Sequence, residues 1–117
     1  MTDYIQVVTT TEREEDARAI ARALVEERLA GCVQIIGPIT SIYRWQGRIE
    51  TSREWQCWAK SRREHYEQIQ ETIRRLHPYE VPEILALDVV AGNPAYLQWL
   101  DDQVARLAGD AGEGDNA

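Results

Sequence analysis

Two long strand-like runs, separated by a pair of turn residues, constrain the fold of this chain more than any other feature. CVQIIGPITSIYRW spans residues 32–45 and RIETSREWQCWAKS spans residues 48–61. Gln46-Gly47 between them is typical of a tight turn, so the two runs predict a hairpin. Proline has no backbone donor for a strand ladder, and Gly37-Pro38 therefore predicts a bulge or an edge position.

The predicted hairpin is too long for the rest of the chain to cover. At about 3.3 Å per residue, a strand of about a dozen residues extends roughly 40 Å. A core built from 117 residues leaves part of that length uncovered. The hairpin therefore predicts self-association through its aromatic residues Tyr43, Trp45, Trp55 and Trp58.

The segments on either side of the hairpin complete one fold pattern. Residues 4–10 favour a strand, residues 11–31 an amphipathic helix, residues 61–77 a second helix and residues 84–90 another strand. The order β-α-β-β-α-β predicts an α+β, ferredoxin-like sandwich with a long central hairpin. A further helix is expected from Asn93 to about Leu107. One domain is expected over residues 1–108, followed by a disordered acidic tail over 109–117.

Local signals predict where the helices begin and end. Thr11 with Glu14, and Ser61 with Glu64, match the capping-box pattern. Asn93-Pro94 matches an N-cap followed by proline at the first helical position. The expected helix C-terminal residues are Gly31 for the first helix and Pro78, as a stop, for the second, with Leu76 closing the apolar stripe of that helix.

The helices of this fold cover only one face of the sheet. The last strand, Ile84–Val90, is apolar on both faces, so an uncovered apolar face is expected. Such a face marks an interaction surface. The pattern therefore predicts a homo-oligomer in which sheets pack on sheets.

Charge and apolar runs exclude several classes of protein. The formal net charge of −7 disfavours a nucleic-acid partner, which requires a basic surface. No apolar run reaches the roughly 18 residues of a membrane helix, and the first residues lack a leader pattern, so a cytoplasmic protein is expected. Cys32 and Cys57 lack metal-type spacing, which disfavours a zinc site within one chain.

Potential metal ligands are few. His77, Glu80 and Glu83 place an imidazole and two carboxylates within one short segment, and Cys32 adds a thiolate. His77 is equally interpretable as a cation at a helix end, and Cys32 as a small buried apolar residue. Cys57 is expected in the core, and His65 on the surface.

A second group of residues suggests a ligand cleft. Lys60 lies near the end of an apolar strand and needs an anionic partner if it is partly buried. Lys60, Tyr79 and Glu80 are therefore a candidate pocket for an anionic or polar ligand, completed by a neighbouring subunit. Tyr79 and Glu80 follow His77 directly, so this pocket would share a segment with the metal candidates. The sequence contains no phosphate-binding glycine loop or hydrolase motif, and we expect no enzymatic activity.

The chain resembles the CutA family of divalent-cation tolerance proteins. The resemblance is carried by GCVQIIGPITSIYRWQGRIE (31–50), WAKSRR (58–63), LHPYEVPEI (76–84) and GNPAYLQWL (92–100), in this order, and it covers about residues 4–105. It implies a homotrimer of ferredoxin-like subunits and a link to copper and other divalent cations. The family is also similar in architecture to the PII signalling proteins, which bind small ligands between subunits.

The resemblance also implies roles for individual residues. Cys32 matches a family cysteine considered as a copper ligand, and His77, Tyr79 and Glu80 match the family's HPYE run. Other residues at family-typical positions are Lys60, Tyr43, Trp45 and Trp99. Some members carry additional cysteines where this chain reads VVTTT and ETIRR. A Cu(II)-type site using His77 and carboxylates is therefore favoured over a thiolate-rich Cu(I) site.

Three hypotheses follow from the sequence. The first is a cytoplasmic, trimeric, non-enzymatic protein that binds divalent cations, copper foremost. The second is a PII-like module that binds a small molecule in a cleft between subunits. The third, an enzyme with Lys60 or His77 as its base, has no acid/base pair in its support.

Overall fold

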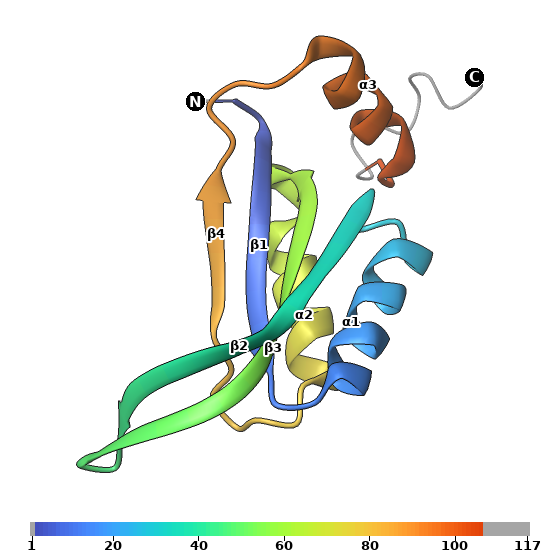
Figure 1. Cartoon of the computed structure of the whole chain (residues 1–117). Coiled ribbons are helices and arrows are strands. Elements are labelled where there is room, and N and C mark those ends of the chain that lie inside the picture. The colour runs from blue at the N-terminus through green and yellow to red at the C-terminus, as the bar shows by residue number, and fades with distance from the viewer. Residues whose placement is uncertain (1, 107–117) are drawn as a thin grey trace.

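The computed structural model describes residues 2–106, which form one four-stranded antiparallel sheet and three α-helices. The strands lie in the order β2-β3-β1-β4. Figure 1 shows α1 and α2 on the same side of this sheet. The predicted ferredoxin-like α+β fold is therefore confirmed. The elements are β1 (Tyr4–Thr11), α1 (Glu14–Glu26), β2 (Cys32–Trp45), β3 (Arg48–Arg62), the 3₁₀ turn η1 (Arg63–His65), α2 (Tyr66–Leu76), β4 (Ile84–Asp88) and α3 (Pro94–Gln103).

The core lies between the sheet and the first two helices. Alternate residues of a strand point to opposite faces, so one side-chain set of β1 faces the helices. The residues that form this core come from β1, β3, α1, α2 and the loop after α1: Ile5, Val7, Ile20, Leu24, Leu29, Ala30, Ala59, Ile69 and Ile73. None of the helices in residues 2–106 is long and apolar enough to cross a membrane.

The hairpin of β2 and β3 extends beyond the body of the molecule, as Figure 1 shows. Pairing runs from Cys32 opposite Lys60 to Trp45 opposite Arg48. Gln46 and Gly47 both have positive φ, as a two-residue hairpin turn requires. The register shifts between Ile36 and Ile39, so the predicted bulge at Gly37-Pro38 is confirmed, and β2 is an edge strand.

The sheet face opposite α1 and α2 keeps large apolar side chains exposed. Leu85 and Leu87 of β4 pair with Val8 and Gln6 of β1, which point away from the core residues Ile5 and Val7. Ile36 lies on this same face. All three apolar side chains are exposed: Ile36, Leu85 and Leu87. The predicted uncovered apolar face is therefore present in the single chain.

Both predicted capping boxes are wrong, because their hydroxyls are used elsewhere. Thr11 belongs to β1 and its hydroxyl donates to the backbone oxygen of Arg13 at 2.8 Å. Ser61 belongs to β3 and its buried hydroxyl donates to the backbone oxygen of Leu29 at 2.5 Å. Satisfying these carbonyls within the fold takes precedence over capping, and neither α1 nor α2 has a side-chain cap.

Other helix boundaries follow the predictions only in part. The first helix ends at Glu26, and Arg28 rather than Gly31 takes the left-handed conformation there, which lets the Leu29 amide donate to the Leu24 carbonyl. The Gly31 amide donates instead to the Lys60 carbonyl. Asn93 caps α3 as predicted, accepting from the Ala95 amide at 3.1 Å. The last predicted strand and helix are shorter than expected, ending at Asp88 and Gln103. Leu107 and the tail 109–117 lie outside the described residues.

Two side chains lie in environments opposite to those expected. His65 was expected on the surface, yet only 1% of it is exposed. It is the last residue of η1, the short turn between β3 and α2, and it is the buried residue of that turn. Leu76 was expected to close the apolar stripe of α2 but is exposed. The stripe ends one turn earlier, at the buried Ile73.

Candidate functional site

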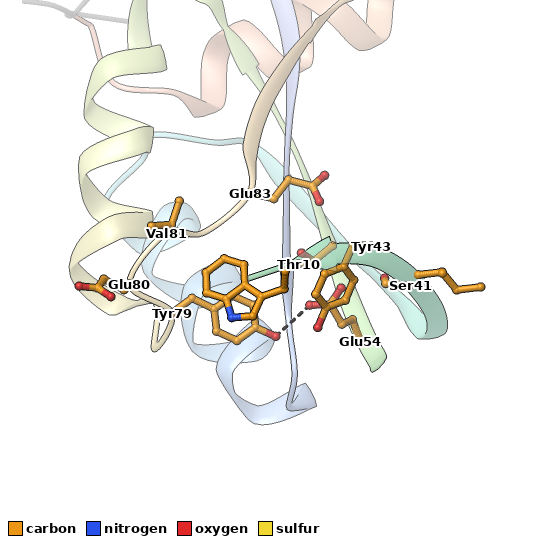
Figure 2. Close-up of a pocket in the computed structure, with 10 residues that line it drawn as sticks. Thr10, Ser41, Tyr43, Glu54, Tyr79, Glu80, Val81 and Glu83 are labelled. Carbon is orange, nitrogen blue, oxygen red and sulfur yellow. Dashed lines mark hydrogen bonds between the residues drawn. The ribbon is translucent and has the colours of Figure 1, made fainter. Parts of the chain in front are cut away.

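A pocket of about 600 Å³ lies between the hairpin and the loop that joins α2 to β4. The hairpin contributes residues of β2 and β3, and the loop contributes the segment after His77. Figure 2 shows the lining side chains drawn around this space. They are Thr10, Ser41, Ile42, Tyr43, Trp45, Glu54, Tyr79, Glu80, Val81 and Glu83.

A hydrogen bond between Tyr79 and Glu54 joins the two sides of the pocket. The Tyr79 hydroxyl donates to Oε2 of Glu54 at 2.8 Å, as the dashed line in Figure 2 shows. Glu54 is only 7% exposed, although it belongs to the projecting hairpin. Burial, and then the contact with Glu54, raise the pKa of Tyr79 well above its usual range. The phenol therefore remains a neutral donor at neutral pH.

His77 holds the loop in place with both of its ring nitrogens. Nε2–H donates to the Thr10 carbonyl at 2.7 Å, and Nδ1 accepts from the Tyr79 amide at 3.1 Å. The rings of His77 and Tyr79 also pack at 4.7 Å between centroids. Pro78 follows the end of α2, and His77 takes the extended conformation that a following proline favours. The ring is therefore a structural clamp, with neither nitrogen free for a metal in this conformation.

The four residues considered as metal ligands do not come together in one chain. Glu80 and Glu83 line the pocket, but in Figure 2 their carboxylates extend in different directions. Cys32 pairs with Lys60, whereas His77 binds Thr10, which pairs with Gln56. Those β3 positions are separated by about 13 Å at 3.3 Å per residue. Residues 2–106 contain no group of three or more His, Cys, Asp or Glu side chains that could hold one metal ion.

The residues expected in a ligand cleft separate into two groups. Tyr43, Trp45 and Tyr79 line the pocket together. Lys60 lies elsewhere and donates to Oε1 of Gln34 at 2.7 Å. Trp99 stacks on Tyr96 in α3, with ring centroids 5.5 Å apart. Burial, and then the neighbouring Cys32 thiol, raise the pKa of Tyr96, so Cys32 belongs to this α3 region.

Sequence reasoning missed three polar residues of the pocket: Thr10, Ser41 and Glu54. Glu54 is opposite Ile39, the first paired residue of β2 after the bulge, and the alternation of β3 places it on the same face as Gln56. Its carboxylate accepts a hydrogen bond from Tyr79 because the hairpin and the loop between α2 and β4 lie on two sides of the same pocket. The only available signal was the face alternation of β3, which does not reveal that partner.

The pocket lining is acidic and aromatic. It contains three carboxylates, those of Glu54, Glu80 and Glu83, and no lysine or arginine among the residues that form it. Carboxylates attract cations and repel anions. The lining therefore suits a cationic ligand, whereas the cleft predicted around Lys60, Tyr79 and Glu80 was expected to bind an anionic or polar one.

The fold and its projecting hairpin define the chain as a ferredoxin-like α+β protein with a pocket under the hairpin. Comparison with protein families assigns it further: the family described as CutA1 divalent ion tolerance protein matches residues 5–103. The chain belongs to this family. The predicted family resemblance is confirmed.

Individual relatives agree with this assignment. The divalent-cation tolerance protein CutA of Thermus thermophilus is 49% identical over 94 residues, which cover 80% of this chain and 91% of that protein. Mouse protein CutA is 45% identical over 103 residues, which cover 88% of this chain but 58% of the longer mouse protein. The structure of Cut A1 from Thermus thermophilus superposes with a TM-score of 0.85 at 45% identity, covering 87% of this chain and 99% of that one.

Two further relatives carry names that specify a compartment. A relative from Arabidopsis thaliana is named as chloroplastic and is 35% identical over 96 residues, covering 82% of this chain and 53% of that protein. A solved structure from Archaeoglobus fulgidus is that of a protein named periplasmic divalent cation tolerance protein CutA, with a TM-score of 0.85 at 32% identity, covering 87% of this chain and 99% of that one. Members of the family are therefore assigned to more than one compartment.

Proposed function

We propose that this chain is a cytoplasmic, non-enzymatic protein that binds divalent cations, Cu(II) foremost, and acts as a homotrimer in metal tolerance. Membership of the divalent ion tolerance family supports the metal role. The single structural observation that supports it best is the acidic lining of the pocket, which includes Glu54, Glu80 and Glu83.

The carboxylates and His77 are the proposed donors. Glu80 and Glu83 are exposed at the edge of the pocket, so a change of side-chain rotamer could bring their carboxylates to an ion. His77 would have to give up its contact with Tyr79 or Thr10 to bind through a ring nitrogen. Cys32 can join these donors only from another copy of the chain, because it lies at the other end of β2. A carboxylate-rich set of this kind suits Cu(II) or Zn(II) better than Cu(I).

Calorimetric titration of the purified protein with Cu(II) and Zn(II) tests this proposal. We expect a Glu80→Gln, Glu83→Gln double variant to bind Cu(II) at least tenfold more weakly, because two charged donors are lost. A Cys32→Ala, His77→Ala double variant tests the other two donors, with its fold checked by circular dichroism. Glu71→Gln, an exposed α2 substitution outside the pocket, is the control. If the wild type and all variants bind Cu(II) equally, these residues have no metal role.

The trimer is supported by the uncovered sheet face. Leu85, Leu87 and Ile36 leave an apolar surface on the side away from the helices. Exposed apolar surfaces of this kind mark protein interfaces. Packing of this face against other copies would also cover part of the overlong hairpin. Sedimentation equilibrium on the purified protein tests the number of subunits.

The size of the pocket favours a second candidate function, a PII-like module that binds a small molecule. A volume of about 600 Å³ is typical of small-molecule sites and larger than one metal ion needs. Tyr43, Trp45 and Tyr79 add aromatic surface that a bare ion does not use. A ligand that binds only the folded protein raises its melting temperature by mass action, so a thermal-shift screen tests this function.

A further inference from the structure

We propose that the pocket under the hairpin binds a small organic ammonium ion, with its positive charge against Glu54 and its carbon groups against the aromatic side chains. The proposal rests on the second candidate function, a small-molecule pocket, and does not depend on the metal role. Three features support it: a buried carboxylate without a positively charged partner, aromatic side chains in the pocket wall, and exposed carboxylates at the edge of the pocket.

Glu54 is a buried carboxylate without a positively charged partner. It is 7% exposed, and its hydrogen-bond partner is the Tyr79 hydroxyl at 2.8 Å. The ion pairs within residues 2–106 involve other carboxylates, and none includes Glu54. Burying a carboxylate is costly unless a cation or several hydrogen bonds compensate for the lost water. The position therefore favours an added cation.

Tyr79 does not neutralise this charge. A neutral hydroxyl donates one hydrogen bond and leaves the negative charge of Glu54 in place. The Tyr79 contact instead orients the carboxylate within the pocket (Figure 2).

Aromatic side chains form much of the remaining wall. Tyr43 and Trp45 come from β2, and Tyr79 comes from the opposite loop. Tyr43 lines the same pocket as Glu54 and Tyr79, and its hydroxyl is hydrogen-bonded to the Ser52 hydroxyl at 2.7 Å. Aromatic faces attract organic cations through their quadrupoles, most strongly quaternary and protonated amines. A metal ion with its water shell would not use these faces.

The carboxylates at the edge of the pocket favour ligands of positive charge. Glu80 and Glu83 lie on the loop at the edge of the pocket and both are exposed. Their charges repel anionic ligands and raise the local concentration of cations. The pocket of about 600 Å³ also has room for several carbon atoms around the charged nitrogen. These properties together specify a small ammonium compound rather than a phosphate or a carboxylate.

Calorimetric titration of the full chain with choline and with putrescine tests the proposal, with inorganic phosphate as the anionic comparison. We expect both amines to bind, phosphate not to bind, and the amine affinity to fall as salt rises. Glu54→Gln should weaken amine binding tenfold or more, because it removes the charge and keeps the shape. Trp45→Ala should weaken it roughly threefold or more. Glu71→Gln removes the same charge outside the pocket and should leave the affinity unchanged.

The possible outcomes separate this proposal from the metal role. Absence of binding by both amines overturns it, including the case where a side chain of another copy fills the pocket. Amine binding that neither Glu54→Gln nor Trp45→Ala weakens also overturns it. If Glu54→Gln does not fold, the affinity of Trp45→Ala for the amines tests the proposal instead. Trp45 is half-exposed at the end of the hairpin, so we expect its substitution to leave the protein folded. Amine binding without Cu(II) binding would support the pocket and contradict the metal function alone.

Discussion

The two histidines of this chain are both buried but have opposite hydrogen-bonding environments. His77 uses both ring nitrogens, one toward Thr10 and one toward Tyr79. His65 is 1% exposed, and neither of its ring nitrogens has a hydrogen-bond partner among the described residues. A buried polar group without a hydrogen-bond partner lowers the stability of the fold, so replacing it with an apolar side chain removes that cost. Replacing a buried group that is hydrogen-bonded instead leaves its partners unpaired, which lowers the stability. The two residues should therefore respond differently to the same substitution.

We expect His65→Leu to leave the free energy of unfolding unchanged or to raise it by up to about 2 kcal/mol, because it removes polar atoms that bond nothing. His77→Leu should lower it by about 2 kcal/mol or more, because it leaves the Thr10 carbonyl and the Tyr79 amide unpaired. Urea unfolding at one fixed protein concentration measures both. Equal destabilisation by the two substitutions would contradict these assignments.

Cys57 gives the stability a defined pH dependence. Its thiol is fully buried and donates to the Ala17 carbonyl at 3.4 Å. Burial raises the pKa of this thiol to about 11 from 9.0. The folded protein thus keeps a proton that the unfolded chain loses first, so the stabilisation is complete below about pH 9 and is lost as the pH rises toward 11.

The expected result is a fall in the free energy of unfolding of wild-type protein between about pH 9 and pH 11 that is smaller in Cys57→Ala. The difference between the two proteins should amount to about 2 kcal/mol across that window. The comparison with the variant cancels the contribution of every other titratable group. If the free energy of unfolding falls with pH equally in the two proteins, Cys57 does not contribute to this pH dependence.

At the scale of the elements, the bulge in β2 shapes the hairpin. Gly37 lies at the register shift, directly under the ring of Trp55. A Cβ placed on Gly37 would lie 2.6 Å from Cε3 of Trp55 and 3.2 Å from the Glu54 carbonyl. No neighbour can yield easily, because one is a rigid ring and the other is backbone. The glycine therefore sets how closely β2 approaches the strand that carries Glu54.

Gly37→Ala should destabilise the protein by about 1–3 kcal/mol, the usual cost of overpacking. It should also shift Trp55 and the backbone of Glu54, which a change in tryptophan fluorescence would report. Gly47→Asn is the matched control: Gly47 has φ of +79° with nothing within 4 Å, and asparagine tolerates that conformation. Fluorescence and stability unchanged by Gly37→Ala would be evidence against this close contact.

For the whole molecule, the main feature is an elongated chain with one apolar sheet face uncovered. Its principal extents are 53 × 27 × 22 Å, with the hairpin projecting from the body (Figure 1). Leu87 lies on the uncovered face and is 42% exposed. Val25 on α1 is 43% exposed, on the opposite side of the sheet. Substitutions at Leu87 and Val25 therefore compare the two sides of the sheet at nearly equal exposure of the side chain.

We expect Leu87→Asp to dissociate the proposed homotrimer or to unfold it, because a charge would be buried in an apolar interface. Val25→Asp should leave the assembly intact. Sedimentation velocity distinguishes the two, and circular dichroism reports the fold of each variant. A folded Leu87→Asp protein with the same mass as the wild type would place the interface elsewhere.

Much of the fold could be predicted because its signals are local. The alternation of residues 32–45 and 48–61, the turn at Gln46-Gly47 and the cap at Asn93 each depend on a few neighbouring residues. The period of the apolar residues specified strands and helices, and the order of these elements specified the fold class. For a given order of strands and helices, only a few topologies connect them by short loops and also bury their apolar faces.

The site depended on contacts between distant parts of the chain. The sequence indicated Tyr43, Trp45, Tyr79, Glu80 and Glu83, which the structure places around one pocket. It did not reveal that Lys60 and Trp99 lie elsewhere. These outcomes depend on strand register and on how the hairpin folds over the loop, which no local pattern encodes.

The amino-acid sequence by itself determined the order of strands and helices, the turn of the hairpin and the membership of a family, because each depends on neighbouring residues or on their order. Only the tertiary structure decided that Ser61 binds a carbonyl instead of capping a helix, that His77 clamps a loop, and that Glu54 meets Tyr79 across the hairpin. A side chain's partner is selected by what burial brings within reach, and burial is a property of the whole fold.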